Sequence, residues 1–253
     1  MLKEKFLAIT SHELKTPVTI LSALTDLLLA DGDDLSREES RELLDRLAEV
    51  ARSLREIVEG MHDLALAREG GISLHREPLD LGSLLAEVVE AMALEGRERG
   101  VAVELEVARP WPAYLGDATR LRRAVRQLVR NGIQYTPDGG RVAVRLDAWQ
   151  PRAGGEEGPA ITVADTGIGI EEEERRLVFD TFYEAADTDH HHTSATAFQG
   201  GGLGIGLSMV LEVVTAHGGR ITLDSEPGEG TTVRLLLPPP SEAERACLEA
   251  GGG

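Results

Sequence analysis

Apolar side chains recur at helical spacing through the first quarter of the chain. Between residues 2 and 28 they return every three to five positions, and between residues 43 and 64 every three or four. Such stripes are typical of helices that pack along one side. The polar run DGDDLS separates them, and its Ser36 with Glu39 matches a capping box that opens a helix. We therefore predict an antiparallel helical hairpin over residues 1–68.

Two helices alone leave part of each apolar stripe uncovered. A homodimer would cover both stripes in a four-helix bundle, and this is the arrangement we predict. The alternative is that the hairpin packs against the rest of its own chain.

The pattern changes after the hairpin. Glycines and a proline mark residues 69–80 as a linker with room for a short strand, and residues 81–240 mix helical periodicity with strand alternation. The predicted helices cover residues 81–99, 117–134 and 203–217, and the predicted strands cover residues 101–107, 141–149, 159–165, 220–226 and 231–238. This order lacks strict strand–helix–strand repetition, so we predict an α+β layer with helices on one face of a mixed sheet. Residues 241–253 are predicted to be a loosely ordered tail.

Composition and charge narrow the possible partners. The formal net charge is −18 and only 4% of the residues are aromatic, which disfavours phosphate backbones and base stacking, so we predict no nucleic-acid partner. Cys247 is the single cysteine, so no disulfide forms within the chain. The sequence has no apolar run of membrane-spanning length and no recognisable signal peptide. We expect a cytoplasmic location, for this chain or as the cytoplasmic portion of a longer membrane receptor.

Glycine-bearing segments in the second half carry the candidate chemistry. DTGIGI follows an apolar strand, and its Asp165 could accept a hydrogen bond from an exocyclic amine. GGLGIGL runs into an apolar helix, which would place bare amides and a helix N-terminus near phosphates. Asn131 lies near a helix end, where its amide oxygen could ligate Mg²⁺. For each glycine segment alone, an ordinary turn is the favoured interpretation.

Taken in order, these segments resemble a sensor histidine kinase. SHELKTP is similar to the phosphoacceptor box of that family, LRRAVRQLVRNGIQYTPDGG to its asparagine box, and VFDTFY to its phenylalanine box. DTGIGI, GGLGIGL and PGEGTT are similar to its three glycine boxes. The resemblance implies a helical dimerisation and phosphoacceptor hairpin, followed by a Bergerat-type α/β sandwich that binds ATP and Mg²⁺. It also implies a homodimer, a response-regulator receiver domain as partner, and an upstream sensor domain or protein.

The same resemblance assigns roles on the hairpin. His12 would be the nucleophile that attacks the γ-phosphorus of ATP, and the adjacent Glu13 can take the proton from its other ring nitrogen. Thr16, one turn on, would orient a water that dephosphorylates the partner. Pro17 removes a backbone donor and tends to bend the helix beside this turn.

The resemblance also assigns residues to the nucleotide. Asn131 would ligate Mg²⁺, Asp165 would recognise the adenine amine, and Tyr135 would line the nucleotide edge, although a packing role for Tyr135 is an open alternative. The glycine boxes would shape the adenine-side turn, the phosphate-side loop with its helix start, and the wall of the base pocket. The residues concerned are Gly167 and Gly169, then Gly202, Gly204, Gly206 and Leu207, and finally Gly228, Gly230 and Thr231.

The chain departs from the family pattern at several positions. Gln127 stands where a first asparagine is common, Gly132 where alanine is usual, and Gln134 where a lysine often reaches phosphate. Thr181 and Glu184 replace frequent arginines, and three other arginines could substitute for the lost charges: Arg126, Arg130 and Arg175. These departures leave open a slow kinase, or a degenerate kinase that acts as a nucleotide-binding or non-catalytic dimeric scaffold. A gyrase- or chaperone-like ATPase is disfavoured because such modules have no use for the hairpin.

The remaining histidines have no assigned chemistry. His190, His191 and His192 fall where the family has a mobile lid, and a solvated loop is favoured over a metal or pH-sensing site. His217 precedes two glycines and is predicted to end a helix. The input signal, the identity of the response regulator and the choice between cis and trans phosphorylation cannot be read from the sequence.

Overall fold

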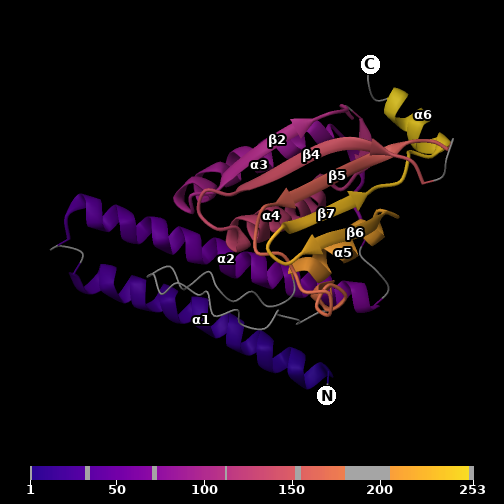
Figure 1. Ribbon diagram of the computed structural model, residues 1–253. Coiled ribbons are helices and arrows are strands. Elements are labelled where there is room, and N and C mark those ends of the chain that lie inside the picture. The colour runs from indigo at the N-terminus through magenta and orange to yellow at the C-terminus, as the bar shows by residue number, and fades with distance from the viewer. Residues whose placement is uncertain are drawn as a thin grey trace. The chain divides into compact units, whose positions relative to one another are not determined.

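The computed structural model describes residues 2–31, 35–69, 73–111, 113–151, 155–179 and 206–250. The chain divides into two compact units, and the boundary between them follows Glu69. The first unit is helical and the second is an α/β unit (Figure 1).

Two long helices form the first unit. Helix α1 covers Leu2–Asp31 and helix α2 covers Arg37–Glu69, and the two pack against each other. The predicted capping box opens α2, because the backbone N–H of Ser36 donates to Glu39 Oε2 at 2.9 Å and that of Glu39 donates to Ser36 Oγ at 3.2 Å. Apolar side chains remain uncovered on both helices, since Leu29 is 80% exposed and Leu44 is 56% exposed.

A five-stranded mixed sheet forms the second unit, with the order β2-β4-β5-β7-β6. The strands are β2 (Ala102–Val107), β4 (Arg141–Trp149), β5 (Gly158–Asp165), β6 (Arg220–Glu226) and β7 (Gly230–Leu236). Strand β2 runs parallel to β4, and every other neighbour is antiparallel. The short strands β1 (Glu77–Leu79) and β3 (Tyr114–Gly116), of which β3 was not predicted, pair as a separate ribbon.

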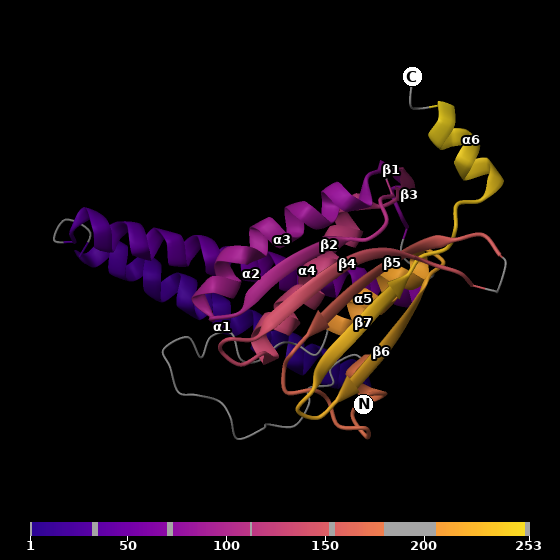
Figure 2. The same cartoon turned by 45° about the horizontal axis from the view of Figure 1, so that its top comes forward.

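Helices cover one face of this sheet. They are α3 (Leu81–Glu98), α4 (Ala118–Tyr135) and α5 (Gly206–Ala216), with the 3-10 turn η1 at Leu177–Phe179 (Figure 2). The core lies between helices and sheet, where Leu121, Val125 and Ile133 of α4 and Val144 and Ile161 of the sheet are at most 1% exposed. The prediction of helices on one face of a mixed sheet is confirmed.

The other face of the sheet carries polar and charged side chains. Arg145 on β4 pairs with Asp147 at 2.8 Å and with Glu106 on β2 at 3.2 Å, and Arg234 on β7 pairs with Asp224 on β6. This alternation of an apolar inner face with a charged outer face is typical of a mostly antiparallel sheet with one solvated side.

A buried histidine connects α5 to the start of α4 through hydrogen bonds, and the same capping residue also binds the linker. His217 lies just after α5 and is 1% exposed. Its Nε2 accepts the backbone N–H of Asp117 at 3.0 Å, and its Nδ1 lies 2.7 Å from the carbonyl oxygen of Val213. Asp117 caps α4 through a bond from the Arg120 N–H at 3.0 Å, and it also accepts the backbone N–H of His75 at 3.0 Å. His217 therefore ends its helix as predicted and also connects α5 to the start of α4.

The C-terminal segment differs from its prediction as a loosely ordered tail. Residues Glu242–Ala250 form helix α6. A capping box opens this helix, because Glu244 Oε2 accepts the Ser241 backbone N–H at 2.7 Å and the Glu244 N–H donates back to Ser241 Oγ at 3.3 Å. Glu244 also pairs with Arg76 in the linker at 2.9 Å. Among the described helices, none is both long and apolar enough to cross a membrane.

Candidate functional site

One row of side chains crosses four strands on the helix-covered face. Strand register sets Val142 of β4 opposite Asp165 of β5, Asp165 opposite Thr231 of β7, and Thr231 opposite Ser225 of β6. Helix α4 closes over this row at Gly132, where an added Cβ would lie 2.9 Å from Val142 Cγ2 and 3.4 Å from Asp165 Cβ. The glycine at this position therefore lets α4 approach the strand end that carries Asp165.

Asp165 is held in one orientation by two backbone amides. The N–H groups of Gly167 and Thr231 donate to its Oδ1 at 2.9 and 3.1 Å. Burial raises the pKa of the Asp165 carboxyl above its ordinary value, and the two amide bonds oppose that rise. Because both amides bond Oδ1, Oδ2 is the oxygen that can accept a donor from a ligand.

Backbone hydrogen bonds hold the DTGIGI loop against neighbouring segments. The Ile168 N–H donates to the carbonyl of Tyr135 at 3.1 Å, and the Ile168 carbonyl accepts the Gly228 N–H at 2.7 Å. Gly169 has a φ of +72°, and a Cβ there would lie 2.0 Å from the carbonyl oxygen of Glu226. Only glycine fits this position, since both the conformation and the contact exclude a side chain.

The turn between β6 and β7 is equally tight against Asp165. Gly230 has a φ of +97°, and a Cβ there would lie 2.0 Å from the Asp165 carbonyl oxygen. Gly167 shows the same crowding, because its Cβ would lie 2.5 Å from the Tyr135 carbonyl oxygen. The structure therefore brings together Asp165, Gly167, Gly169 and Thr231, as predicted from widely separated segments.

Asn131 lies on α4 one turn before Tyr135, beside the start of α5. Its Oδ1 accepts a hydrogen bond from Gln127 Nε2 at 2.8 Å. The Gln127 side chain also lies against Gly206, the first residue of α5, because a Cβ at Gly206 would be 2.6 Å from Gln127 Nε2. Leu207 is half-buried in the same first turn. Gln127 thus connects the predicted metal ligand to a helix N-terminus, a role that the sequence pattern did not reveal.

The donor set at this end fits Mg²⁺ held jointly with a ligand. Mg²⁺ prefers hard oxygen donors and is usually bound by one or two protein groups together with phosphates and waters. Asn131 Oδ1 provides one such oxygen and retains a lone pair beside its bond from Gln127. The described residues hold no group of three His, Cys, Asp or Glu side chains that could bind a metal by themselves.

Two family models match the chain. One is the His Kinase A (phospho-acceptor) domain over residues 2–70, and the other is the histidine kinase-, DNA gyrase B- and HSP90-like ATPase over residues 116–241. Together they span well over half of the chain.

The chain belongs to the histidine kinase family.

Curated relatives agree with this assignment. The signal transduction histidine-protein kinase/phosphatase MprB of Mycobacterium leprae (strain TN) is 35% identical over 234 residues, 90% of this chain and 41% of MprB. The aerobic respiration control sensor protein ArcB of Escherichia coli (strain K12) is 31% identical over 245 residues, 96% of this chain and 29% of ArcB. This histidine kinase chain thus spans less than half the length of these relatives.

Solved structures of histidine kinases share its fold. The mycobacterial sensor histidine kinase MprB matches with a TM-score of 0.51 and 31% identity, over 64% of this chain and 97% of that one. Full-length ShkA in complex with AMPPNP matches with a TM-score of 0.64 and 23% identity, over 91% of this chain and 45% of that one. The second likeness covers both the helical and the α/β unit.

The predicted phosphoacceptor residues of this histidine kinase lie on α1. His12 and Glu13 are helical, and the structure describes their backbone only. Thr16 is exposed one turn further on, and the helix continues through Pro17. Gly202 and Gly204 lie outside the described residues, as do Thr181, Glu184 and the histidines at 190–192.

The arginines considered as substitutes for lost cations face different surroundings. Arg175 Nε donates to the carbonyl of Ile170, at the end of the DTGIGI loop, at 3.3 Å. Arg130 pairs with Glu95 of α3 at 3.8 Å. Arg175 is therefore anchored beside the adenine-side loop, whereas Arg130 is engaged with a neighbouring helix.

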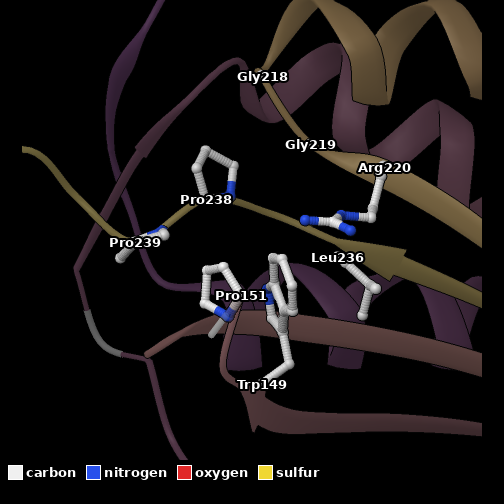
Figure 3. A pocket seen from close by; sticks show the side chains of 8 residues that line it. All are labelled: Trp149, Pro151, Gly218, Gly219, Arg220, Leu236, Pro238 and Pro239. Atoms are coloured by element: carbon white, nitrogen blue, oxygen red, sulfur yellow. The ribbon is translucent and has the colours of Figure 1, made fainter. Parts of the chain in front are cut away.

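A separate shallow hollow lies at the end of β5 opposite to Asp165. Trp149, Arg220 and three prolines line this shallow hollow of about 180 Å³ (Figure 3). The Arg220 guanidinium lies 5.0 Å from the centre of the Trp149 ring, and Trp149 Nε1 donates to the Leu237 carbonyl at 2.7 Å. Ligand pockets usually measure about 300–1,000 Å³. This hollow is therefore smaller than a typical ligand pocket.

Proposed function

We propose that this chain is an ATP-dependent protein-histidine kinase that autophosphorylates His12 and passes the phosphoryl group to an aspartate of a response regulator. The observation that carries the proposal is the Asp165 site: one oriented carboxylate, two glycine turns packed on it, and Asn131 on the adjacent helix. The family matches support the kinase and give no support to the degenerate scaffold.

Adenine recognition follows from the chemistry of Asp165. A carboxylate only accepts hydrogen bonds, and the exocyclic amine of adenine only donates them. Asp165 is partly buried, which strengthens such a bond because fewer waters compete for the carboxylate. Tyr135 is 48% exposed at the end of α4, and we place its ring at the nucleotide edge.

Phosphates and Mg²⁺ would occupy the Asn131 end. Mg²⁺ would be held by Asn131 Oδ1 together with phosphate oxygens, and it would supply charge neutralisation on the transferring phosphoryl group. The N-terminus of α5, starting at Gly206 and Leu207, offers amides to the same phosphates. The predicted loop glycines Gly202 and Gly204 would extend this cradle. Helix amides thus provide positive potential in a chain whose net charge is −18.

In the proposed phosphoryl transfer, neutral His12 on α1 would be the nucleophile. Its imidazole attacks the γ-phosphorus in line, a phosphoramidate forms, and ADP leaves. Glu13 would accept the proton from the other ring nitrogen. Thr16 would orient a water for dephosphorylation of the response regulator, which would make the chain a phosphatase as well.

The proposed assembly is a homodimer. Exposed Leu29 and Leu44 on the two hairpin helices give apolar area that a four-helix bundle would cover. The receiver partner is also a proposal: ThkA, whose structure was solved in complex with the response regulator protein TrrA, matches with a TM-score of 0.58 at 18% identity. We propose a cytoplasmic location and an upstream sensor domain or protein.

Labelling with γ-labelled ATP and Mg²⁺ tests the proposal. We expect label that is lost in acid and stable in alkali, absent in His12→Ala, and retained in the matched control His62→Ala on α2. Chelation of Mg²⁺ should abolish it. Measurable ATP binding without label would refute kinase activity and return the scaffold interpretation.

A further inference from the structure

The hollow beside Trp149 belongs neither to the proposed nucleotide site nor to the phosphoacceptor hairpin (Figure 3). Trp149 is the last residue of β4 and lies opposite Gly158 of β5, which has no side chain to stop the indole from crossing that strand. The indole Nε1–H donates to the Leu237 carbonyl, just after β7, at 2.7 Å. This bond fixes the ring as one wall of the hollow.

The other walls are mostly apolar and rigid. Leu236 of β7 lines the hollow together with Pro151, Pro238 and Pro239. Proline has a fixed φ and loses almost no side-chain freedom on burial, so a hollow lined by its rings is formed before a ligand arrives. The volume of about 180 Å³ suits a ligand that is smaller than a drug-sized molecule.

Hydrogen-bond donors of the lining are already used, except those of one side chain. The Trp149 Nε1–H is bonded to a carbonyl, and the Gly218 and Gly219 N–H groups donate to carbonyls of α5 at 2.8 and 2.9 Å. The three prolines have no N–H. The guanidinium of Arg220, the first residue of β6, therefore supplies the donors that a ligand in the hollow would meet.

Arg220 has no carboxylate partner among the residues that the structure describes. The acidic residues on the same outer face of the sheet are engaged elsewhere, since Asp224 pairs with Arg234 and Asp147 pairs with Arg145. In a chain with 44 acidic and 26 basic residues, an arginine without an acid leaves room for a carboxylate from outside the chain.

The geometry of Arg220 suits such a carboxylate. Its guanidinium lies 5.0 Å from the centre of the Trp149 ring, and a guanidinium over an aromatic face keeps its in-plane N–H donors for both oxygens of a carboxylate. We propose that the hollow binds a small amphipathic carboxylate, with its charged end on Arg220 and its apolar body against Leu236 and the proline rings. The inference does not depend on the proposed nucleotide site.

Benzoate is a suitable probe because it joins one carboxylate to a small ring, and benzamide is its neutral match. The chain has two tryptophans, so two indole N–H signals are expected by NMR, and Trp111→Phe assigns them. We expect benzoate to shift the Trp149 signal until it saturates and to leave the Trp111 signal in place. Benzamide should bind about tenfold more weakly or worse, the value of one charge-assisted hydrogen bond.

A pair of variants isolates the charged contact. Arg220→Gln should weaken benzoate binding about tenfold and leave benzamide binding unchanged, because it removes the cation and keeps the apolar walls. The matched control Arg234→Gln removes a cation on the same face that is already paired with Asp224, so benzoate binding should be retained. Dispersed amide signals in the same spectra check that each variant is folded.

Three results would overturn the inference. The first is equal affinity of the parent chain for benzoate and benzamide, and the second is undiminished benzoate binding in Arg220→Gln. The third is competition between benzoate and ADP, which would place the acid in the nucleotide site and not in the hollow.

Discussion

Removing the buried imidazole of His217 should destabilise the α/β unit strongly. The ring is 1% exposed and serves both of its neighbours, because Nδ1 donates to the Val213 carbonyl at 2.7 Å and Nε2 accepts the Asp117 N–H at 3.0 Å. This pair of contacts fixes a neutral ring with its proton on Nδ1. His217→Ala deletes both bonds.

The size of the effect follows from the two bonds. The Asp117 N–H would be buried without its partner, a loss of about 1–3 kcal/mol, and the second bond adds about 1 kcal/mol because the Val213 carbonyl keeps its bond from the His217 backbone. We expect a loss of roughly 3 kcal/mol in the free energy of unfolding. For a unit of this size that is a fall in Tm of about 6–12 °C.

The same residue should give a pH dependence of defined sign. Burial lowers the pKa of His217 below its ordinary value, so the unfolded chain binds its proton more readily than the folded chain does. The contribution of His217 to stability is therefore complete above about pH 6.5 and is lost as pH falls toward the folded pKa, by at most about 1.4 kcal/mol per pH unit. In His217→Ala, this dependence of the free energy of unfolding on pH should be absent.

Denaturant unfolding followed by tryptophan fluorescence measures both effects. Parent and variant are compared between pH 8 and pH 5. The matched control is His75→Ala, which removes an exposed ring and keeps the backbone N–H that Asp117 accepts. Equal free energies of unfolding for His217→Ala and the parent at pH 8 would refute the reasoning. So would the same change of that free energy with pH in both chains between pH 6.5 and 5.

Three further predictions concern other parts of the chain. Gly169→Ala should abolish detectable nucleotide binding because its Cβ would lie 2.0 Å from the Glu226 carbonyl oxygen, whereas the control Gly139→Ala, at a φ of +84° with open space around it, should cost only about 1 kcal/mol of stability and bind normally. Adenine nucleotide affinity should fall as Asp165 becomes protonated, with a midpoint above that of an ordinary aspartate because burial raises its pKa; calorimetric titrations at decreasing pH that gave an ordinary midpoint would contradict this. Ser36→Ala should reduce hairpin stability by about 1 kcal/mol through loss of the capping box, and circular dichroism melting of the hairpin checks it.

Patterns with a strict period predicted most of the fold. Strands β4 and β6 were predicted at their observed bounds, because apolar positions alternate along them and glycines or prolines flank them. The capping box at Ser36 and Glu39 was also predicted correctly. Strand β3 was missed since it has only three residues, and α6 was missed because its Ser241–Glu244 box follows a run of prolines that indicates a break.

The site was only partly predictable from the sequence. Its residues come from separate segments, and the register of the strand pairing decides which of them become neighbours. Asp165 and Thr231 could be named from their motifs, and the antiparallel pairing of β5 with β7 makes them neighbours. Gln127 is a departure from the asparagine box, and Ser225 lies outside the motifs. Their roles depend on packing across elements, namely the contact of Gln127 with Gly206 and the bond of Ser225 to Ile170.

The most direct test of the account is to locate the phosphoryl group. The chain is incubated with Mg²⁺ and ATP, kept in alkali, and mapped by mass spectrometry, with phosphorus NMR to identify the bond. We predict a phosphoramidate on His12 and on no other residue. Phosphate on another side chain, or an unmodified His12 in a chain that demonstrably binds ATP, would contradict the assignment of this protein as a histidine kinase acting through His12.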